Sequence, residues 1–149
     1  MSHQFRLAQP EDHPRIIEIW ESAVKATHDF LAEEDFRYFK EIIPRDYLPA
    51  LEVYLIIENG EAKGFASVAE GCLEMLFIHS EVRGQGYGRK LYQFIKEKTK
   101  LTRVDVNEQN LQAIGFYEKM GFRKIGKRRF RKRLPDHPYE LTGGALYLQ

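Results

Sequence analysis

The sequence has only one cysteine, Cys72, among its 149 residues, so an intrachain disulfide is excluded. Small secreted domains that depend on disulfides are thereby excluded as well. Long apolar runs are also lacking, because the longest covers residues 53–57 and a membrane span needs roughly 18 apolar residues. The first fifteen residues contain no apolar signal-peptide segment. We therefore expect a cytoplasmic protein that is not secreted and has no membrane partner.

Histidine clusters with metal-ligand spacing are lacking too, since His3, His13 and His137 stand far apart. We expect no bound metal. Core material is present, because 43% of the residues are hydrophobic and 13% are aromatic. A chain of this length buries roughly 70% of the surface that its unfolded form exposes. The composition therefore predicts one folded domain over residues 1–149.

The net charge of +1 conceals an uneven distribution of charge along the chain. Residues 1–61 carry 6 basic and 13 acidic side chains, whereas residues 123–149 carry 8 basic and 2 acidic ones. All 8 of those basic residues lie in the run 123–133, which contains no acid. Two interpretations fit this run. It is either a solvated edge strand that its charges protect from aggregation, or a weak contact surface for RNA or an acidic protein.

The spacing of apolar residues predicts the order of helices and strands. Helical periodicity covers residues 16–24, 36–43, 91–95 and 111–120, and the second helix is expected to stop at Pro44. Strands are predicted at residues 4–8, 53–57, 64–69, 73–78, 101–106, 122–131 and 139–148. Turn residues at 58–61 and 70–71 join three of these strands into an antiparallel meander. The order predicts an α+β fold, a mixed sheet covered by helices.

A glycine-rich loop at residues 83–89 joins a predicted strand to a predicted helix. Glycines let successive backbone N–H groups converge, and a helix N-terminus attracts anions, so the junction suits a phosphate. A flexible surface loop with ordinary arginines is the other interpretation. The Gly-Lys-Ser/Thr of a Walker loop is absent, and Arg89 stands where a dinucleotide-binding fingerprint requires its third glycine.

Two spaced motifs resemble those of the GNAT superfamily of N-acetyltransferases, especially its small stand-alone bacterial members. Arg83, Gly86 and Gly88 form the pattern Arg-x-x-Gly-x-Gly, which resembles the acetyl-CoA pyrophosphate loop. Residues 107–122 read Asn-x-x-Asn-x-x-Ala-x-x-Phe-Tyr-x-x-x-Gly-Phe, which is similar to a later strand-to-helix segment of the superfamily. The resemblance implies a mostly antiparallel mixed sheet, splayed at a central parallel strand pair and flanked by about four helices.

The same resemblance implies a set of contacts to acetyl-CoA. The edge of the strand before the loop would pair with the pantetheine arm, the loop would bind the pyrophosphate, and a later asparagine would also contact the cofactor. These residues are Leu76, Phe77, Ile78, Arg83, Gly84, Gln85, Gly86, Tyr87, Gly88, Arg89 and Asn110. For Asn110, a role as the N-cap of the next helix fits as well.

Two side chains are candidates for the chemistry of acetyl transfer. Tyr117 matches the family tyrosine near the acetyl sulfur, where it would protonate the leaving thiolate or donate a hydrogen bond to it. The alternative role of Tyr117 is packing against Ala113, Phe116 and Met120. Glu74 shares the strand parity of Leu76 and Ile78 and is a candidate base for the attacking amine, although a solvated glutamate or a water chain fits too. His79 is a second candidate base.

The resemblance implies that the first two helices shape the acceptor site, with His28, Asp29 and Phe30 as substrate-binding residues. It implies direct transfer of acetyl to a primary amine in a ternary complex, with a protein lysine or N-terminal amine ahead of a small amine. Two alternatives remain open: an amine presented on RNA, such as a charged tRNA, or a non-catalytic nucleic-acid-binding module that uses residues 123–133. Both a monomer and a homodimer are compatible with the sequence.

Overall fold

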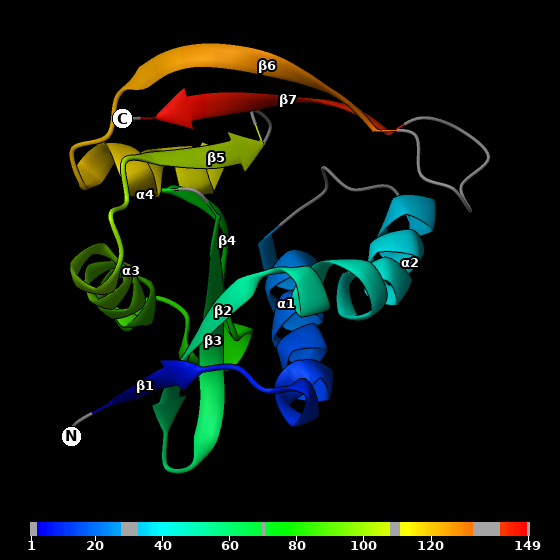
Figure 1. Ribbon diagram of the computed structural model, residues 1–149, viewed down its shortest axis with the longest axis vertical. Helices are drawn as coiled ribbons and strands as arrows, with labels where there is room; N and C mark the ends of the chain where they lie inside the picture. The colour runs from blue at the N-terminus through cyan, green and yellow to red at the C-terminus, as the bar shows by residue number, and fades with distance from the viewer. Residues whose placement is uncertain (1–2, 28–32, 70, 108–110, 133–140, 149) are drawn as a thin grey trace. The chain divides into compact units, whose positions relative to one another are not determined.

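The computed structural model describes residues 3–27, 33–69, 71–107, 111–132 and 141–148 (Figure 1). The chain forms two compact units, residues 1–101 and residues 102–149. The order of main helices and strands is the predicted one throughout. The bounds of the elements differ modestly from the predicted ones. For example, the third strand begins at Glu61, whereas its predicted start is Gly64.

The three strands predicted as an antiparallel meander form one in the first unit, and the first strand of the chain adds a fourth to the same sheet. Its strands are β1 (Gln4–Leu7), β2 (Glu52–Glu58), β3 (Glu61–Ala69) and β4 (Cys72–Ile78), and each pairs with the next along the chain. Asn59 and Gly60 join β2 to β3 with φ angles of 53° and 78°. Two successive positive φ angles are typical of the tight turn that the Asn-Gly pair predicts.

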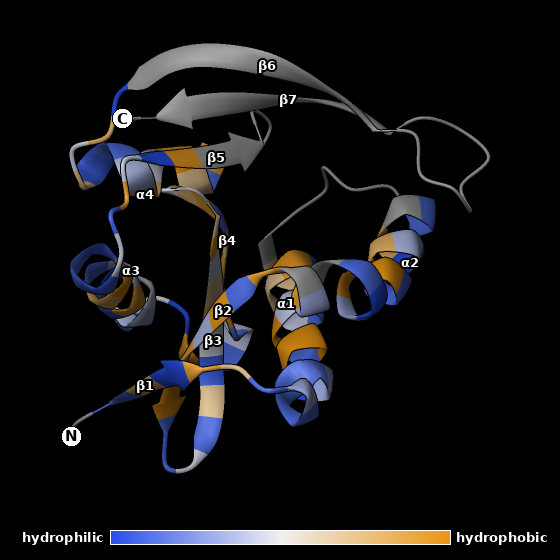
Figure 2. Cartoon of the chain, viewed as in Figure 1, coloured by the Kyte–Doolittle hydropathy of each residue, from blue (hydrophilic) through white to orange (hydrophobic). Residues whose placement is uncertain are grey.

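Helices cover both faces of this sheet. α1 (His13–Thr27) contacts β3 and β4 on one side, and α3 (Tyr87–Lys98) contacts β2, β3 and β4 on the other (Figure 1). Neighbouring residues of β2 contact different helices, because successive side chains of a strand point to opposite faces of the sheet. Leu55 belongs to a buried core with Ile16 and Ile19 of α1, whereas the Tyr54 ring lies 5.9 Å from the ring of Phe94 in α3. Figure 2 shows hydrophobic positions on β2, α1 and α3.

The path after the second helix differs from the prediction at Pro44. α2 (Glu33–Ile42) ends near the predicted residue, but the chain then continues as a π-helical turn, Ile43–Tyr47, and a 3-10 turn, Leu48–Ala50. Pro44 lies in the first turn of the π-helical segment and has no backbone N–H to donate to a carbonyl in the last turn of α2. Proline therefore ends the α-helix here without ending the helical path.

The second unit contains α4 (Leu111–Lys119) and the strands β5 (Arg103–Asn107), β6 (Lys124–Lys132) and β7 (Leu141–Leu148). β7 pairs antiparallel with both β5 and β6. The basic run predicted as a strand therefore forms one over most of its length. The side chains of residues 124–132, and all of residue 133, lie outside the described part of the chain.

Candidate functional site

The loop before α3 adopts the backbone conformation that its glycines allow. Gly84 and Gly86 have φ angles of +78° and +86°, a region that L side chains rarely adopt. Within the described residues, a Cβ atom added at either glycine would meet no atom within 4 Å. The space over this loop is therefore open, and a ligand can approach its backbone closely.

The N-terminus of α3 presents backbone donors at the end of this loop. Gly86 is the N-cap residue and has no side chain with which to cap the helix. The N–H of Lys90 donates to the Gly86 carbonyl at 3.1 Å, which begins the helical hydrogen bonding. The amides of residues 87–89 precede that bond and have no carbonyl partner within the helix. Together with the positive end of the helix dipole, they suit a bound phosphate or pyrophosphate.

Exposed basic side chains lie at both ends of the loop in the sequence. Arg89 and Lys90 lie in the first turn of α3, and Arg83 precedes the two glycines. The Arg83 guanidinium donates a hydrogen bond from Nη1 to the carbonyl of Ala26, at 3.4 Å, near the C-terminal end of α1. Positive charge is favourable at a helix C-terminus. Arg83 therefore links the loop to α1 in addition to any role toward an anion.

Tyr87 has a partner that sequence reasoning missed. Its phenol donates a hydrogen bond to the Glu58 carboxylate at the end of β2, and Tyr87 itself is only 5% exposed. This bond lowers the pKa of Glu58 and raises the pKa of Tyr87. The contact spans 29 positions of the chain, and Glu58 showed only a turn signal in the sequence. No local pattern could have found it.

The predicted pantetheine-pairing strand is β4. Leu76, Phe77 and Ile78 are half-buried, and they pair on one edge with residues of β3. Ile78 lies opposite Gly64, where an added Cβ would clash with Ile78 Cδ1 and come within 3.0 Å of the Phe77 carbonyl oxygen. A larger residue at position 64 would therefore displace the Ile78 side chain from this close approach of β3 and β4.

Glu74 lies at an irregularity in the same strand. β3 pairs Val68 with Leu73 and Ser67 with Met75, so Glu74 has no Cα partner in the register. Such an extra residue is a β-bulge, which changes the direction of the side chains around it. The alternation that placed Glu74 with Leu76 and Ile78 is therefore interrupted beside it. Its side chain is exposed.

His79, the second candidate base, has its Nδ1 atom engaged. Nδ1 accepts the backbone N–H of Glu81 at 3.1 Å. The Nδ1 atom is therefore engaged by the backbone of the turn that follows. Ser22 of α1 lies beside it and accepts the N–H of Ser80 at 2.9 Å. The geometry favours a role for His79 in shaping the turn before the loop.

Tyr117 belongs to the second unit and is 6% exposed. Its ring packs edge-to-face with Phe116 and Phe122, at centroid distances of 5.2 and 5.8 Å. Its carbonyl accepts the Phe122 N–H at 3.1 Å, and the Gly121 N–H donates to Glu118 at 3.0 Å. With Gly121 at φ +97°, this is a Schellman motif that ends α4. The Gly-Phe end of the second sequence motif therefore has a structural role.

Some predicted site residues lie outside the described part of the chain. They are His28, Asp29, Phe30 and Asn110. In the described segments, three or more His, Cys, Asp or Glu side chains do not gather into a group that could hold a metal. None of the helices that can be described is long and apolar enough to cross a membrane.

The helix-covered sheet, with a glycine loop that leads into the N-terminus of α3, is the arrangement that the resemblance to acetyl-CoA-dependent acyltransferases implies. The family model described as acetyltransferase (GNAT) domain matches residues 21–143. The peptidyl-lysine N-acetyltransferase YjaB of Salmonella typhimurium is 36% identical over 128 residues, which cover 85% of this chain and 88% of that protein. The chain therefore belongs to the GNAT family and is an acetyl-CoA-dependent N-acetyltransferase.

Solved structures confirm the predicted GNAT-like α+β fold. The apo form of YjaB from Escherichia coli matches with a TM-score of 0.82 and 30% identity, covering 99% of this chain and 97% of that chain. The PaiA N-acetyltransferase from Thermoplasma acidophilum, solved in complex with coenzyme A, matches with a TM-score of 0.70. This match covers 97% of this chain and 98% of that chain. Its sequence identity is 17%, so it shows the fold alone.

Proposed function

We propose that the chain acetylates the ε-amino group of lysine residues in proteins, by direct attack of the amine on acetyl-CoA in a ternary complex. The observation that carries acetyl transfer is the open glycine loop before the uncapped N-terminus of α3. The choice of lysine is supported by the relative named as a peptidyl-lysine N-acetyltransferase, which is 36% identical across most of the chain. An N-terminal or small amine is the alternative acceptor.

Acetyl-CoA would be held mainly by backbone groups. The N–H groups of residues 85–89 would bind its pyrophosphate, and Arg83 and Arg89 would supply positive charge. The backbone of residues 76–78 in β4 would pair with the amides of its pantetheine arm. Asn110 would add a contact from the second motif. The thioester supplies an activated acetyl group, so the protein has only to position the acceptor amine and manage two protons.

Tyr117 would act on the leaving group. When the amine attacks the thioester carbon, the C–S bond breaks and the sulfur leaves as a thiolate that needs a proton. A thiol has a pKa of about 8.5 and a phenol about 10, so positioning must assist the transfer. Burial against Phe116 and Phe122 supplies a fixed ring position. The phenol would then protonate the sulfur or donate a hydrogen bond to it.

The acceptor must lose a proton before it attacks, because a lysine amine with a pKa of about 10.4 is almost fully protonated at neutral pH. Glu74 is the side-chain candidate for this base, and its exposed position also suits a base that works through water. On the acceptor side, His28, Asp29 and Phe30 would contact the substrate. The exposed carboxylates of Glu33 and Glu34 at the start of α2 favour a cationic amine nearby.

A panel of acceptors tests the proposal. The purified chain is incubated with acetyl-CoA and, in separate reactions, a lysine peptide with a blocked N-terminus, a lysine-free peptide with a free N-terminus, spermidine and a charged tRNA, while released thiol is measured. The proposal predicts the largest kcat/KM for the blocked lysine peptide. Preference for any other acceptor overturns the lysine assignment. If none of the acceptors causes thiol release, acetyl transfer to all of these amine classes is overturned.

A further inference from the structure

Glu58 lies at the end of β2, outside both motifs, yet its carboxylate contacts the glycine loop's helix. It accepts the phenol hydrogen bond of Tyr87, the first residue of α3. His3 lies beside the same carboxylate, with Nε2 3.1 Å from Glu58 Oε2, but the two atoms lack hydrogen-bond geometry. The hydrogen bond from Tyr87 therefore ties the Glu58 carboxylate to the start of α3.

The Tyr87 ring is enclosed by the same neighbours. The His3 ring meets it edge-on, with centroids 4.8 Å apart, and Lys90 Nζ lies 5.9 Å from its centroid. Lys90 Nζ also approaches His3 Nδ1 at 3.4 Å. The first turn of α3 is therefore anchored through one side chain to β2 and to the residue before β1.

This anchor matters because of what precedes Tyr87. Gly84 and Gly86 both have positive φ angles, and the space beside them is open in the described structure, so between the Arg83 bond to Ala26 and Tyr87 the glycines add no side-chain restraint of their own. Glycine is also the residue with the greatest backbone freedom to lose. The direction of the first α3 amides then depends on how firmly Tyr87 is held.

We propose that Glu58 is a positioning residue for acetyl-CoA: by accepting the hydrogen bond of the Tyr87 phenol, it fixes the direction of the backbone donors at the start of α3. The inference rests on the proposed binding of the pyrophosphate by residues 85–89. Glu58 touches no substrate. Its negative charge would repel a diphosphate, so its use here is mechanical, through the buried tyrosine.

The test compares the acetyl-CoA dissociation constant of several variants by isothermal titration calorimetry. Glu58→Ala and Tyr87→Phe each remove the same hydrogen bond, and each should weaken acetyl-CoA binding about tenfold, as expected for one bond to a charged group. The double variant should be no weaker than the single ones, because the two residues act as a pair. Glu58→Gln keeps an oxygen acceptor and should restore binding to within about threefold.

The matched control is Glu61→Ala, across the same β2–β3 turn. Glu61 pairs with Lys63 and Arg15 and has no bond to Tyr87, so acetyl-CoA should bind this variant as tightly as the wild type. At saturating acetyl-CoA, kcat and the acceptor KM of Glu61→Ala should stay within about twofold of the wild-type values. A merely structural role would lower the Tm without moving the acetyl-CoA dissociation constant.

Two failures are distinguishable. If Gly86→Ala weakens acetyl-CoA binding but Glu58→Ala and Tyr87→Phe do not, the role of Glu58 is overturned and the loop assignment stands. If Gly86→Ala binds acetyl-CoA like the wild type, the loop is not the pyrophosphate site, and the proposed function of residues 85–89 fails together with the inference. Tyr87→Phe keeps the buried ring, so the comparison survives even if Glu58→Ala folds poorly.

Discussion

At the scale of single residues, two buried tyrosines, one from each motif, have different proposed roles. The phenol of Tyr87 donates a hydrogen bond to Glu58, and that carboxylate raises the pKa of Tyr87. A phenol in that state is a poor proton donor. Tyr117 is equally buried, and its ring packs against two phenylalanines. It matches the family tyrosine near the acetyl sulfur, and it is the residue that we propose for the chemistry.

Tyr117→Phe tests this assignment. The variant keeps the ring packing and removes only the hydroxyl, so it should lower kcat by about 10² while the acetyl-CoA dissociation constant stays nearly the same. Steady-state kinetics with released thiol and calorimetry measure the two quantities. Tyr38→Phe, in α2, is the control for loss of a tyrosine hydroxyl. An unchanged kcat in Tyr117→Phe would return the residue to the packing role.

Asp12 provides a test of pH dependence. Arg6 donates two hydrogen bonds to its carboxylate at 2.8 Å and the Gln9 N–H donates a third at 2.7 Å. The Arg6 bond is the main reason that the pKa of Asp12 is lowered in the folded protein. The contribution to stability is therefore fully present above about pH 4, near the unfolded value, and is lost as pH falls through the folded pKa.

Asp12→Asn should accordingly lower the free energy of unfolding by about 1 kcal/mol at pH 7. The difference from the wild type should shrink as the pH falls below about 4, as measured by urea unfolding. Asp46→Asn is the control, because Asp46 is half-exposed and its described ion pair is with the adjacent Arg45. A difference for Asp12→Asn that stays constant across this pH range would contradict the assigned role.

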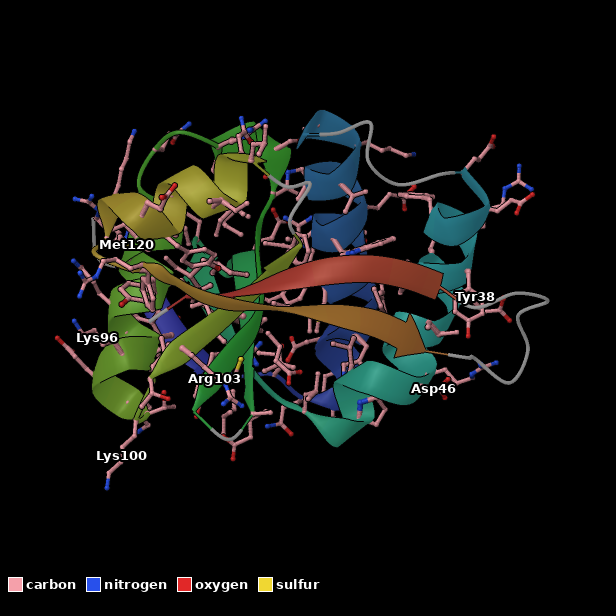
Figure 3. The ribbon with its side chains drawn as sticks, turned by 90° about the horizontal axis from the view of Figure 1, so that it is seen from above. Tyr38, Asp46, Lys96, Lys100, Arg103 and Met120 are labelled. Carbon is pink, nitrogen blue, oxygen red and sulfur yellow. The ribbon has the colours of Figure 1, made fainter. Side chains whose placement is uncertain are left out.

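At the scale of elements, the ends of helices decide how the motifs are presented. α4 ends at Gly121, whose positive φ closes the Schellman motif and brings Phe122 against Tyr117. α3 ends differently, with Lys96 and Lys98 in its last turn, where cations complement the helix dipole. Figure 3 shows Lys96 pointing outward from the helix and Lys100 just beyond its end.

Gly121→Ala tests the end of α4. A side chain at φ +97° is strained, so the variant should lower the free energy of unfolding by about 1 kcal/mol or more. Gly115→Ala, inside α4, is the matched control. An added Cβ at Gly115 meets no described atom within 4 Å, and alanine in a helix is favoured over glycine by up to about 1 kcal/mol. Chemical unfolding should therefore give opposite signs, and equal signs would refute the helix-end argument.

At the scale of the whole molecule, ligand linkage separates an acetyltransferase from a nucleic-acid-binding module. A ligand that binds only the folded chain stabilises it by about 2.7 kcal/mol at 100 times its dissociation constant. Acetyl-CoA should therefore raise the Tm, and Arg83→Ala should reduce that rise. Arg37→Ala, which removes an exposed arginine paired with Glu33, is the control of equal charge.

Salt dependence completes that test. A nucleic-acid binder that uses residues 123–133 should lose affinity steeply between about 50 and 200 mM salt. Stabilisation by acetyl-CoA should survive the same change, because the site that we propose would bind it largely through backbone groups. A chain that acetyl-CoA leaves at the same Tm, while RNA binding falls steeply with salt, would support the non-catalytic alternative.

The sequence by itself determined the order of the helices and strands and the positions of the two motifs. Local physics suffices for these, since apolar periodicity, the Asn59-Gly60 turn and the glycines of residues 83–88 each act over a few residues. The sequence pattern predicted that the second helix simply stops at Pro44 and did not predict the π-helical turn that follows. Strand alternation could not reveal the bulge at Glu74, because the bulge depends on the register with β3.

Only the tertiary structure decided which distant side chains meet. Folding brings Glu58 to Tyr87 and Arg83 to the end of α1. These pairs are separated by 29 and 57 positions, and no periodic pattern encodes such contacts. They arise because strands and helices with buried faces pack in one way, and that packing selects which polar groups must pair where water is excluded.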